Sequence, residues 1–344
     1  MHANVIDAAN SGTTIRIATS IAALSDGKAV LSGDQSLQKR PMQPLLDALE
    51  SLGAKCSSSN GKPPISISGK IKGGEVVIPG NISSQFVSSL MIVAPKSENG
   101  IVLNIKDELV SKPYVDATIM AMKEFAVNVE TVIPYQKYII SQQNYKPTTF
   151  TIPSDFSSAA LLLSAAVLIG ENLTIQVTMG KLPQADEAII DILEVLGAVV
   201  TLEKGHITIK SPAKLEGGRF DLSNSPDLLP AIAILALKKT KPIEIFNVEH
   251  ARYKETDRIA ILARELGKLG VKVVEKKDGL ILKNSGKLTG ADLNSENDHR
   301  LFMAFCIAGM YVGNCTVSDP ESVEISYPNF ISDMKRAGSK IFLN

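Results

Sequence analysis

Two sequence patterns recur along the chain about every 70 residues, and this repetition constrains the fold more than any other feature. The first pattern is an amphipathic helix that ends in a turn and continues as a strand, as in LLDALESLGAKC and LARELGKLGVKV. Leucines three and four positions apart form one apolar face of each predicted helix. The turn residues are Gly53, Ala126, Gly197, Gly270 and Gly338. Glycine readily adopts the left-handed conformation that ends many helices, so Ala126 departs from the pattern.

The second pattern is a capping residue followed by an almost entirely apolar segment, and its copies alternate with those of the first. These segments begin at Ser11, Ser84, Ser157, Pro226 and Asp298, and a β-like run such as IVLNIK or NLTIQV follows each one. A helix that is apolar on all sides has to be enclosed by its neighbours. The repeated unit is therefore predicted to contain a buried helix, a strand, an amphipathic helix and two further strands.

The length of 344 residues exceeds that of one ordinary domain, ~100–200 residues, so two domains are expected. The polar segment YQKYIISQQNYKPTTFTIPSD contains two prolines and is predicted to hold a hinge near residues 146–154. This hinge places two repeat units in a first domain, residues 1–150, and three units in a second domain, residues 151–344.

Charge and composition argue against several classes of partner. Lys plus Arg and Asp plus Glu both number 36, so no overall field favours nucleic acid or an anionic membrane. Cys56, Cys306 and Cys315 match no metal-ligand spacing and are expected to be reduced thiols, with no metal site. The longest apolar run, AALLLSAAVLIG, is shorter than the ~20 residues of a membrane span, and MHANVIDAANSG lacks a secretory pattern. We expect a cytoplasmic protein and, as the simplest assembly, a monomer.

The segment NSENDHRLFMAFCIAGM carries an acid, a histidine and an arginine directly before a helix that reads as buried. If the buried helices run roughly parallel, their N-termini meet on one face and present unpaired N–H groups and positive partial charge. An arginine at such an end, like Arg300, opposes the helix dipole unless an anion lies between them. The pattern therefore indicates an anion site built from several helix starts.

The residues at these helix starts, and in the second loop of each unit, are mostly hydroxyls, amides and bases. They are Asn10, Ser11, Gly12, Thr13, Ser83, Ser84, Gln85, Asp155, Ser157, Ser158, Asp227, Asp298, His299 and Arg300, with Arg40, Ser111, Tyr114, Lys254, Glu255, Asp257 and Arg258 from the loops. Singly, most would be helix caps or solvated ion pairs. Together they favour a small metabolite with several phosphate or carboxylate groups, and the acids among them could transfer protons.

Six motifs, NSGTTIR, GDQSLQKRPM, SSQF, SKPY, YKETDR and NDHR, occur in this order over nearly the whole chain. Together they resemble the 5-enolpyruvylshikimate-3-phosphate (EPSP) synthase family. The resemblance implies an α/β (α+β) fold of two domains, each with repeated βαβαββ units and buried helices around a pseudo-threefold axis. It also implies transfer of the enolpyruvyl group of phosphoenolpyruvate to the 5-hydroxyl of shikimate 3-phosphate, with no metal and no cofactor.

The same resemblance implies roles for individual residues, motif by motif. Shikimate 3-phosphate would be held by Ser83, Ser84, Gln85, Ser111, Tyr114, Asp227 and Lys254, and phosphoenolpyruvate by Gly12, Arg40, Gln85, Arg258 and Arg300. Asp227, helped by Lys254, would accept the hydroxyl proton, and Glu255 would protonate and then deprotonate the methylene carbon. Supporting residues would be Asn10, Thr13, Arg16, Asp298 and His299.

The sequence departs from the family pattern in three places. The Lys-Ser-x-x-x-Arg motif that binds both substrates is absent, so the first of six repeat units is expected to be missing at the N-terminus. Ile325 stands where some members have a lysine, and His250 where an asparagine is frequent. These departures leave an alternative open, namely an inactive remnant that only binds shikimate 3-phosphate or similar anions. A nucleotide-binding enzyme lacks support, because neither glycine-rich phosphate motif is present.

Overall fold

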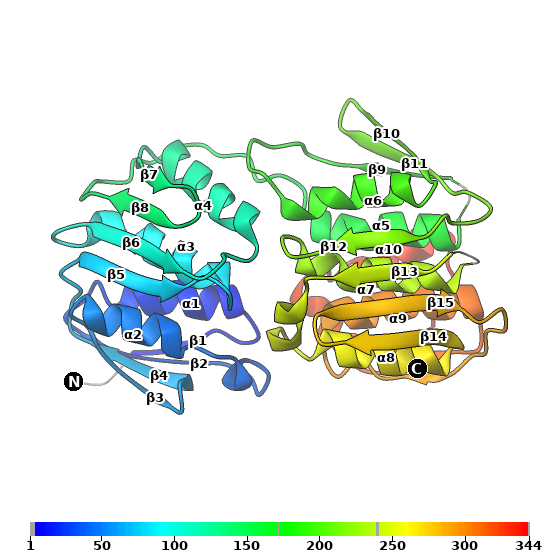
Figure 1. The fold of residues 1–344 in the computed structure, drawn as a ribbon, viewed down its shortest axis with the longest axis horizontal. Coiled ribbons are helices and arrows are strands. Elements are labelled where there is room, and N and C mark those ends of the chain that lie inside the picture. Colours follow the sequence, from blue (N-terminus) through cyan, green and yellow to red (C-terminus); the bar gives the residue numbers. More distant parts are fainter. Residues whose placement is uncertain (1–3, 171, 239–240, 343–344) are drawn as a thin grey trace. The chain divides into compact units, whose positions relative to one another are not determined.

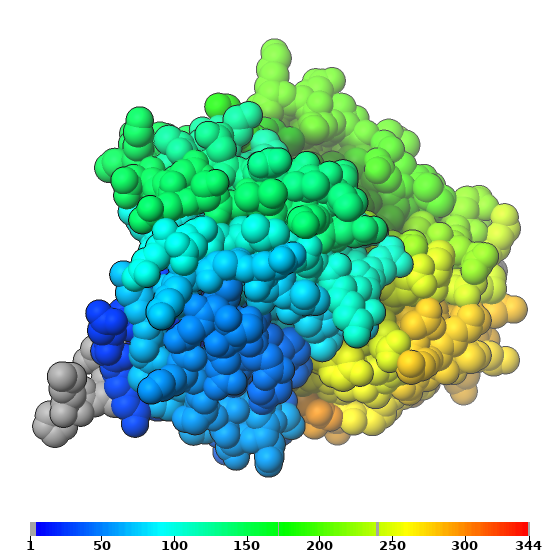
Figure 2. Space-filling model, turned by 60° about the vertical axis from the view of Figure 1, so that its left-hand side comes forward, coloured from blue at the N-terminus to red at the C-terminus, as the bar shows by residue number. Residues whose placement is uncertain are grey.

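The structure, a computed structural model, describes residues 4–170, 172–238 and 241–342. The chain divides into two compact units, called unit 1 and unit 2 below (Figure 1). Unit 1 comprises Met1–Thr151 and Leu182–Gln184, and unit 2 comprises Ile152–Lys181 and Ala185–Asn344. Each is built mainly from one continuous stretch of chain, coloured blue to green for unit 1 and green to orange for unit 2 in Figure 2. The main division falls inside the segment for which a hinge is predicted.

Unit 1 contains the order βαβαββ twice. The first copy consists of β1 (Asn4–Asp7), α1 (Gly12–Ala22), β2 (Lys28–Ser32), the 3₁₀ turn η1 (Leu37–Lys39), α2 (Gln43–Ser51), β3 (Lys55–Ser59) and β4 (Lys62–Ser68). The second consists of β5 (Gly74–Pro79), α3 (Ser84–Val93), η2 (Ala94–Lys96), β6 (Ile101–Lys106), α4 (Lys112–Glu124), β7 (Glu130–Ile133) and β8 (Lys137–Ile140). The two sheets have the orders β1-β2-β4-β3 and β5-β6-β8-β7, with a parallel first pair and antiparallel remaining pairs.

Among its described residues, unit 2 contains three further copies, of which the second is complete and the first and third lack strands. The first has α5 (Phe156–Leu168), β9 (Asn172–Gln176), η3 (Ala185–Ala188), α6 (Ile189–Val195), β10 (Val199–Glu203) and β11 (His206–Lys210). The second has β12 (Gly218–Asp221), η4 (Pro226–Leu228), α7 (Leu229–Ala233), η5 (Ile234–Leu237), β13 (Ile243–Phe246), η6 (Glu249–Tyr253), α8 (Arg258–Lys268), β14 (Val271–Lys276) and β15 (Gly279–Asn284). The third has β16 (Asp292–Leu293), α9 (His299–Val312), β17 (Thr316–Val317), η7 (Pro320–Ile325) and α10 (Phe330–Arg336).

The sheets of unit 2 differ in completeness among its described residues. The sheet β12-β13-β15-β14 repeats the topology of unit 1, whereas the sheet β10-β11-β9 has three strands and β16 pairs only with β17. Successive side chains of a strand point to opposite faces, so one face of a sheet can be apolar and pack against helices. In β5 and β6, Val76 pairs with Leu103 and Ile78 with Ile105, and all four are buried. The predicted α/β fold of repeated βαβαββ units is confirmed.

The apolar helices form the cores, as predicted. Eleven of the thirteen residues of α5 are buried, and α9 is buried along most of its length. Each unit has its own hydrophobic core. No helix in the described part of the chain is long and apolar enough to cross a membrane.

One predicted helix is interrupted. The apolar segment that begins at Pro226 forms a 3₁₀ turn, the five-residue helix α7 and a second 3₁₀ turn instead of one continuous helix. Pro230 explains the break, because a proline inside a helix lacks the N–H group and crowds the preceding turn. The segment is nevertheless buried throughout.

Candidate active site

Helices α1 and α3 lie side by side in unit 1 and run in the same direction. At their first turns, Gln85 Nε2 donates a hydrogen bond to Thr13 Oγ1 at 3.0 Å. Further along both helices, Ser20 Oγ donates to Ser89 Oγ at 3.1 Å. Residue numbers increase together along the two helices, so their N-termini meet and their positive partial charges add.

Serine hydroxyls cap both of these helix ends. Ser11 Oγ accepts a hydrogen bond from the backbone N–H of Thr14 at 3.1 Å, and Ser83 Oγ accepts one from that of Gln85 at 3.3 Å. The structural role expected of Ser11, a cap, is therefore confirmed. Ser84 is the first residue of α3 and is buried.

Arg16, one turn inside α1, lies across the starts of both helices. Its Nη1 donates to Gln85 Oε1 and, at 3.4 Å, to Ser83 Oγ. The guanidinium carbon lies 4.9 Å from the centroid of the Phe86 ring, a cation–π contact. Only 7% of Arg16 is exposed, so its orientation is fixed by its surroundings.

Gly12 and Arg40 approach each other so closely that a side chain at position 12 would displace the Arg40 guanidinium. A Cβ atom added to Gly12 would lie 2.7 Å from Arg40 Nη1 and 3.5 Å from Arg16 Nη1. Arg40 Nη2 donates to Asn10 Oδ1 at 3.4 Å, and Asn10 Nδ2 donates to Asp34 Oδ2 at 2.8 Å. Two buried guanidinium groups thus lie beside one helix N-terminus, an arrangement suited to a phosphate.

These residues make up what we call the unit 1 cluster: Asn10, Gly12, Thr13, Arg16, Arg40, Ser83 and Gln85. Tyr114 belongs to α4, which packs against α3, and Ser111 is the residue directly before α4. Neither residue takes part in the hydrogen bonds described above. Ser111 is buried in the left-handed conformation with φ of 55°, unusual for a residue with a side chain. Tyr114 is 36% exposed.

Arg258 is the centre of a second charged group, in unit 2. The residue is 1% exposed, and its guanidinium donates to three carboxylates: to Asp227 Oδ1 at 2.7 Å, to Glu255 Oε2 at 2.6 Å and to Asp298 Oδ2 at 2.7 Å. Burial lowers the pKa of Arg258, but Asp298, Glu255 and Asp227 outweigh burial and raise it above its usual value. These three acids come from different elements, so Arg258 fixes them relative to one another.

Asp227 forms ion pairs with three cations. Besides Arg258, Lys254 Nζ lies 3.5 Å from Oδ1 and Arg300 Nη2 lies 3.6 Å from Oδ2. Burial by itself raises the pKa of Asp227, but Lys254, Arg300 and Arg258 hold it well below its usual range. Asp227 is therefore ionised at neutral pH and can accept a hydrogen bond or a proton. We call Asp227, Lys254, Glu255, Arg258, Asp298 and Arg300 the unit 2 cluster.

Asp298 and His299 join this cluster to helix α9. Asp298 caps the helix by accepting from the backbone N–H of Arg300 at 3.0 Å and of Leu301 at 3.3 Å. His299 is 5% exposed, and burial lowers its pKa to about 4. It is therefore neutral at physiological pH and adds no charge to the cluster.

Two buried residues next to the unit 2 cluster are absent from the site predicted from sequence. Asp186 in η3 is 2% exposed and accepts a hydrogen bond from Ser157 Oγ. His250 in η6 is 8% exposed, and burial, with Lys254, lowers its pKa to about 4. The repeat pattern could have pointed to Asp186, because it lies 11 residues before Gly197 and Arg258 lies 12 before Gly270.

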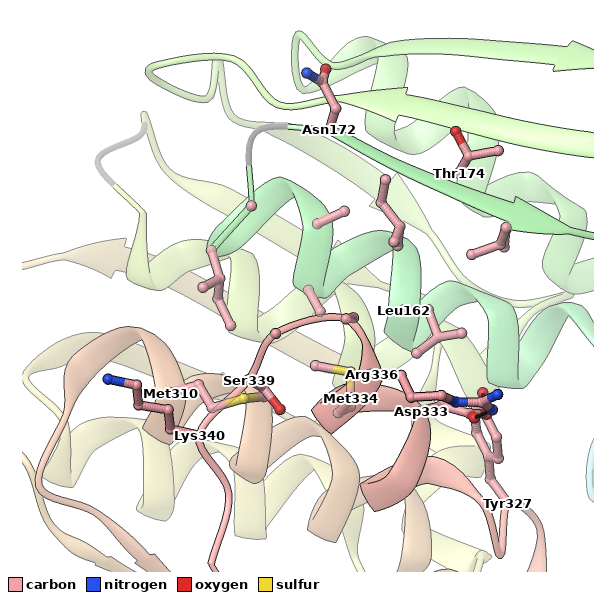
Figure 3. A pocket seen from close by; sticks show the side chains of 18 of the residues that line it. Leu162, Asn172, Thr174, Met310, Tyr327, Asp333, Met334, Arg336, Ser339 and Lys340 are labelled. Atoms are coloured by element: carbon pink, nitrogen blue, oxygen red, sulfur yellow. Dashed lines mark hydrogen bonds and ion pairs between the residues drawn. The ribbon is translucent and has the colours of Figure 1, made fainter.

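Neither cluster has the composition of a metal centre. Within the ranges the structure describes, His, Cys, Asp and Glu side chains form no group of three that could hold a metal ion. A groove of about 930 Å³ in unit 2 lies elsewhere, between α5, β9 and the segment around α10 (Figure 3). Its lining includes Leu162, Leu173, Met310 and Met334 but no member of the unit 2 cluster.

Comparison with known proteins gives a consistent result across the chain. Residues 1–334 match the family described as EPSP synthase (3-phosphoshikimate 1-carboxyvinyltransferase). A 3-phosphoshikimate 1-carboxyvinyltransferase of Nitrosopumilus maritimus is 66% identical over 336 residues, which cover 98% of this chain and 80% of the relative. The enzyme of that name from Methanosarcina mazei is 46% identical over 345 residues, with the same two coverages.

A solved structure supports the same conclusion. The EPSP synthase of Acinetobacter baumannii superimposes with a TM-score of 0.78 at 25% sequence identity, over 98% of this chain and 80% of that chain. The family match over residues 1–334 includes every residue of the two clusters. The chain belongs to the EPSP synthase (3-phosphoshikimate 1-carboxyvinyltransferase) family.

Proposed function

We propose that this protein transfers the enolpyruvyl group of phosphoenolpyruvate to the 5-hydroxyl of shikimate 3-phosphate and releases phosphate. The product, 5-enolpyruvylshikimate 3-phosphate, lies on the route to chorismate and the aromatic amino acids. The observation that carries this proposal is the unit 2 cluster, where Asp227 and Glu255 are both bound to buried Arg258. Membership of the EPSP synthase family supports the same reaction.

The reaction needs one group that accepts a proton from oxygen and one that exchanges a proton with carbon. The hydroxyl oxygen bonds to C2 of phosphoenolpyruvate while the methylene carbon gains a proton, which gives a tetrahedral intermediate. The bond from C2 to the phosphate oxygen then breaks and the methyl carbon loses a proton. We assign the hydroxyl proton to Asp227, which is ionised and contacts Lys254, and both proton transfers at carbon to Glu255.

The remaining residues bind the acidic groups of the two substrates. Shikimate 3-phosphate is assigned to the hydroxyl and amide groups of unit 1, namely Ser83, Ser84, Gln85, Ser111 and Tyr114, with Asp227 and Lys254. The phosphate of phosphoenolpyruvate is assigned to Gly12 and Arg40, and its carboxylate to Arg258 and Arg300. The scheme uses no metal ion and no organic cofactor.

Arg258 and Arg300 make different contacts, which suits them to different roles in this scheme. The guanidinium of Arg258 is already bound by three carboxylates. Arg300 lies 3.6 Å from Asp227, and its Nη1 is buried with no hydrogen-bond partner among the described residues. Arg300 is therefore the better donor to an incoming carboxylate, and Arg258 mainly orients the acids.

The alternative, a remnant that binds shikimate 3-phosphate without turnover, is less favoured. Binding that phosphate does not require a second acid, yet Glu255 is held 2.6 Å from Arg258. The carboxyvinyltransferase named among the relatives shares 66% of its aligned residues with this chain. Both considerations favour catalysis.

The direct test is phosphate release from phosphoenolpyruvate and shikimate 3-phosphate by the purified protein. Glu255→Gln keeps the shape of the side chain and removes its acid–base function, so turnover should fall about 10²- to 10⁴-fold. Glu249→Gln is the control, because Glu249 in η6 is partly exposed and pairs with Lys277 rather than with the cluster, and this variant should keep normal turnover. Binding of shikimate 3-phosphate without any phosphate release by the unmodified protein would establish the inactive alternative.

A further inference from the structure

Asp186 is a buried carboxylate at the start of the amphipathic part of the third repeat. It is 2% exposed, and the hydrogen bond from Ser157 Oγ to Oδ2 comes from an uncharged group. The other oxygen, Oδ1, is buried and has no hydrogen-bond partner in the described part of the chain. One hydrogen bond from a hydroxyl offsets little of the free energy that a carboxylate loses when it leaves water. Packing alone therefore does not explain why an acid occupies this position.

The charges around Asp186 come from several elements of unit 2. Asp227 in η4 and Asp155 at the start of α5 act on it as like charges, and Arg300 in α9 acts as the opposite charge. Helix α6 also packs against η3, but its acids Asp191 and Glu194 are exposed. Burial and Asp227 raise the pKa of Asp186 to about 6, although Ser157 and Arg300 oppose the rise.

Direct contact with a cation separates Asp186 from the other acids. Asp227, Glu255 and Asp298 each contact Lys254, Arg258 or Arg300. In the described part of the chain no cation lies within 4 Å of Asp186, whose one side-chain hydrogen bond comes from Ser157. Arg300 is nevertheless close enough for each of the two groups to affect the pKa of the other.

Arg300 has a complementary feature. Its side chain is 12% exposed, and its buried Nη1 has no hydrogen-bond partner among the described residues. An anion that reaches this guanidinium would place a second negative charge near ionised Asp186. Protonation of Asp186 would remove the repulsion between the two.

We propose that Asp186 is a positioning residue for the enolpyruvyl donor, acting as a second counter-ion of Arg300 that takes up a proton when the donor's carboxylate binds. The identity of that carboxylate rests on the proposed function, whereas the pairing of Asp186 with Arg300 does not. Asp186 does not touch the reacting atoms in this scheme. It sets the affinity of Arg300 for the donor and the dependence of that affinity on pH.

The pairing is testable without substrate. In protein labelled with ¹³C at aspartate carboxyl carbons, the signal of Asp186 is identified by its loss in Asp186→Asn. We expect a titration midpoint near pH 6 that rises in Arg300→Gln, because a favourable positive charge is removed, and returns in Arg300→Lys. Arg336→Gln, which changes an exposed side chain of α10, is the matched control and should leave the midpoint unchanged. The same midpoint in Arg300→Gln as in the unmodified protein would overturn the pairing.

The proton uptake is tested by the pH dependence of kcat/KM for phosphoenolpyruvate at saturating shikimate 3-phosphate. Asp186→Asn mimics the protonated acid and preserves an acceptor for Ser157. The quantity compared is kcat/KM of Asp186→Asn divided by kcat/KM of the unmodified protein, in which titration of phosphoenolpyruvate itself cancels. This quotient should rise between pH 6 and 8 by up to tenfold per pH unit, mainly through KM. A quotient that stays constant with pH would refute the proton uptake. Absence of turnover in the unmodified protein would contradict the proposed function, and the carboxyl titration would then decide the pairing of Asp186 with Arg300.

Discussion

Asp298 binds Arg258 and caps helix α9 with the same carboxylate. Oδ2 accepts from Arg258 Nε at 2.7 Å, while Oδ1 accepts from Arg258 Nη2 at 3.3 Å and from the backbone N–H of Arg300 at 3.0 Å. The residue is fully buried. One side chain thus couples the start of a core helix to the arginine that holds both proposed catalytic acids.

Loss of this carboxylate should destabilise the protein strongly. Asp298→Ala removes a helix cap and leaves Arg258 with one buried partner fewer, and breaking a buried ion pair costs about 3–5 kcal/mol. Asp155→Ala is the matched control, because Asp155 caps α5 from an exposed position and should cost only about 1 kcal/mol. Equilibrium unfolding in urea measures both. Equal losses in the two variants would show that Asp298 acts as an ordinary cap.

Gly12→Ala should weaken the binding of phosphoenolpyruvate. The added methyl group would lie 2.7 Å from Arg40 Nη1, so the guanidinium has to move away from the helix start. We expect KM for phosphoenolpyruvate to rise about tenfold, equivalent to about 1.4 kcal/mol, with a smaller change for shikimate 3-phosphate. Gly267→Ala in α8 is the control, because a Cβ there meets no atom within 4 Å. Unchanged KM in Gly12→Ala would separate Arg40 from the donor site.

The elements of the fold that follow from local chemistry could be predicted from the sequence. Ser84 and Asp298 mark helix starts within one residue because a capping side chain precedes a long apolar run. Gly53 and Gly197 mark the turns, with φ of 111° and 99°. The apolar character of the segment from Pro226 predicts one continuous helix, and the structure differs there because Pro230 interrupts the helical hydrogen bonds.

The site was harder to predict than the fold, because its partners come from distant segments. The YKETDR motif indicates an anion-binding arginine, but it cannot show that Asp227 and Asp298 converge on Arg258. Asp186 stands in the segment KLPQADEA, whose only base is Lys181, so the local sequence does not indicate an arginine near it. Its burial beside Arg300 depends on the packing of η3 against α5, which no local pattern specifies.

The two buried histidines should make the protein less stable in mild acid. Burial lowers the pKa values of His250 and His299 to about 4, while both would titrate near 6.5 in the unfolded chain. Between pH 6.5 and 4 the unfolded state binds more protons, so the free energy of unfolding falls as pH falls, by at most about 1.4 kcal/mol per unit for each histidine. Above pH 6.5 this effect vanishes.

Comparison of variants isolates this effect from the titration of carboxylates. His250→Gln should flatten the pH dependence of the urea midpoint between pH 4.5 and 6.5. His206→Gln removes an exposed histidine from β11 and should leave the dependence as it is. The same slope in all three proteins would mean that His250 is not held neutral by its surroundings.

Ala126→Gly should stabilise unit 1. Ala126 occupies the turn that follows α4 with φ of 64°, a left-handed conformation that costs a residue with a Cβ about 1–2 kcal/mol. Part of that gain is offset because glycine loses more conformational entropy on folding, so we expect a net stabilisation of up to about 1 kcal/mol. The reciprocal change, Gly197→Ala, places a Cβ in an open position, 3.9 Å from its nearest neighbours, but at φ of 99°. That variant should be destabilised by backbone strain alone. Urea unfolding followed separately for the two variants checks both signs, and a loss of stability in Ala126→Gly would show that the methyl group of Ala126 contributes more through packing than its backbone conformation costs.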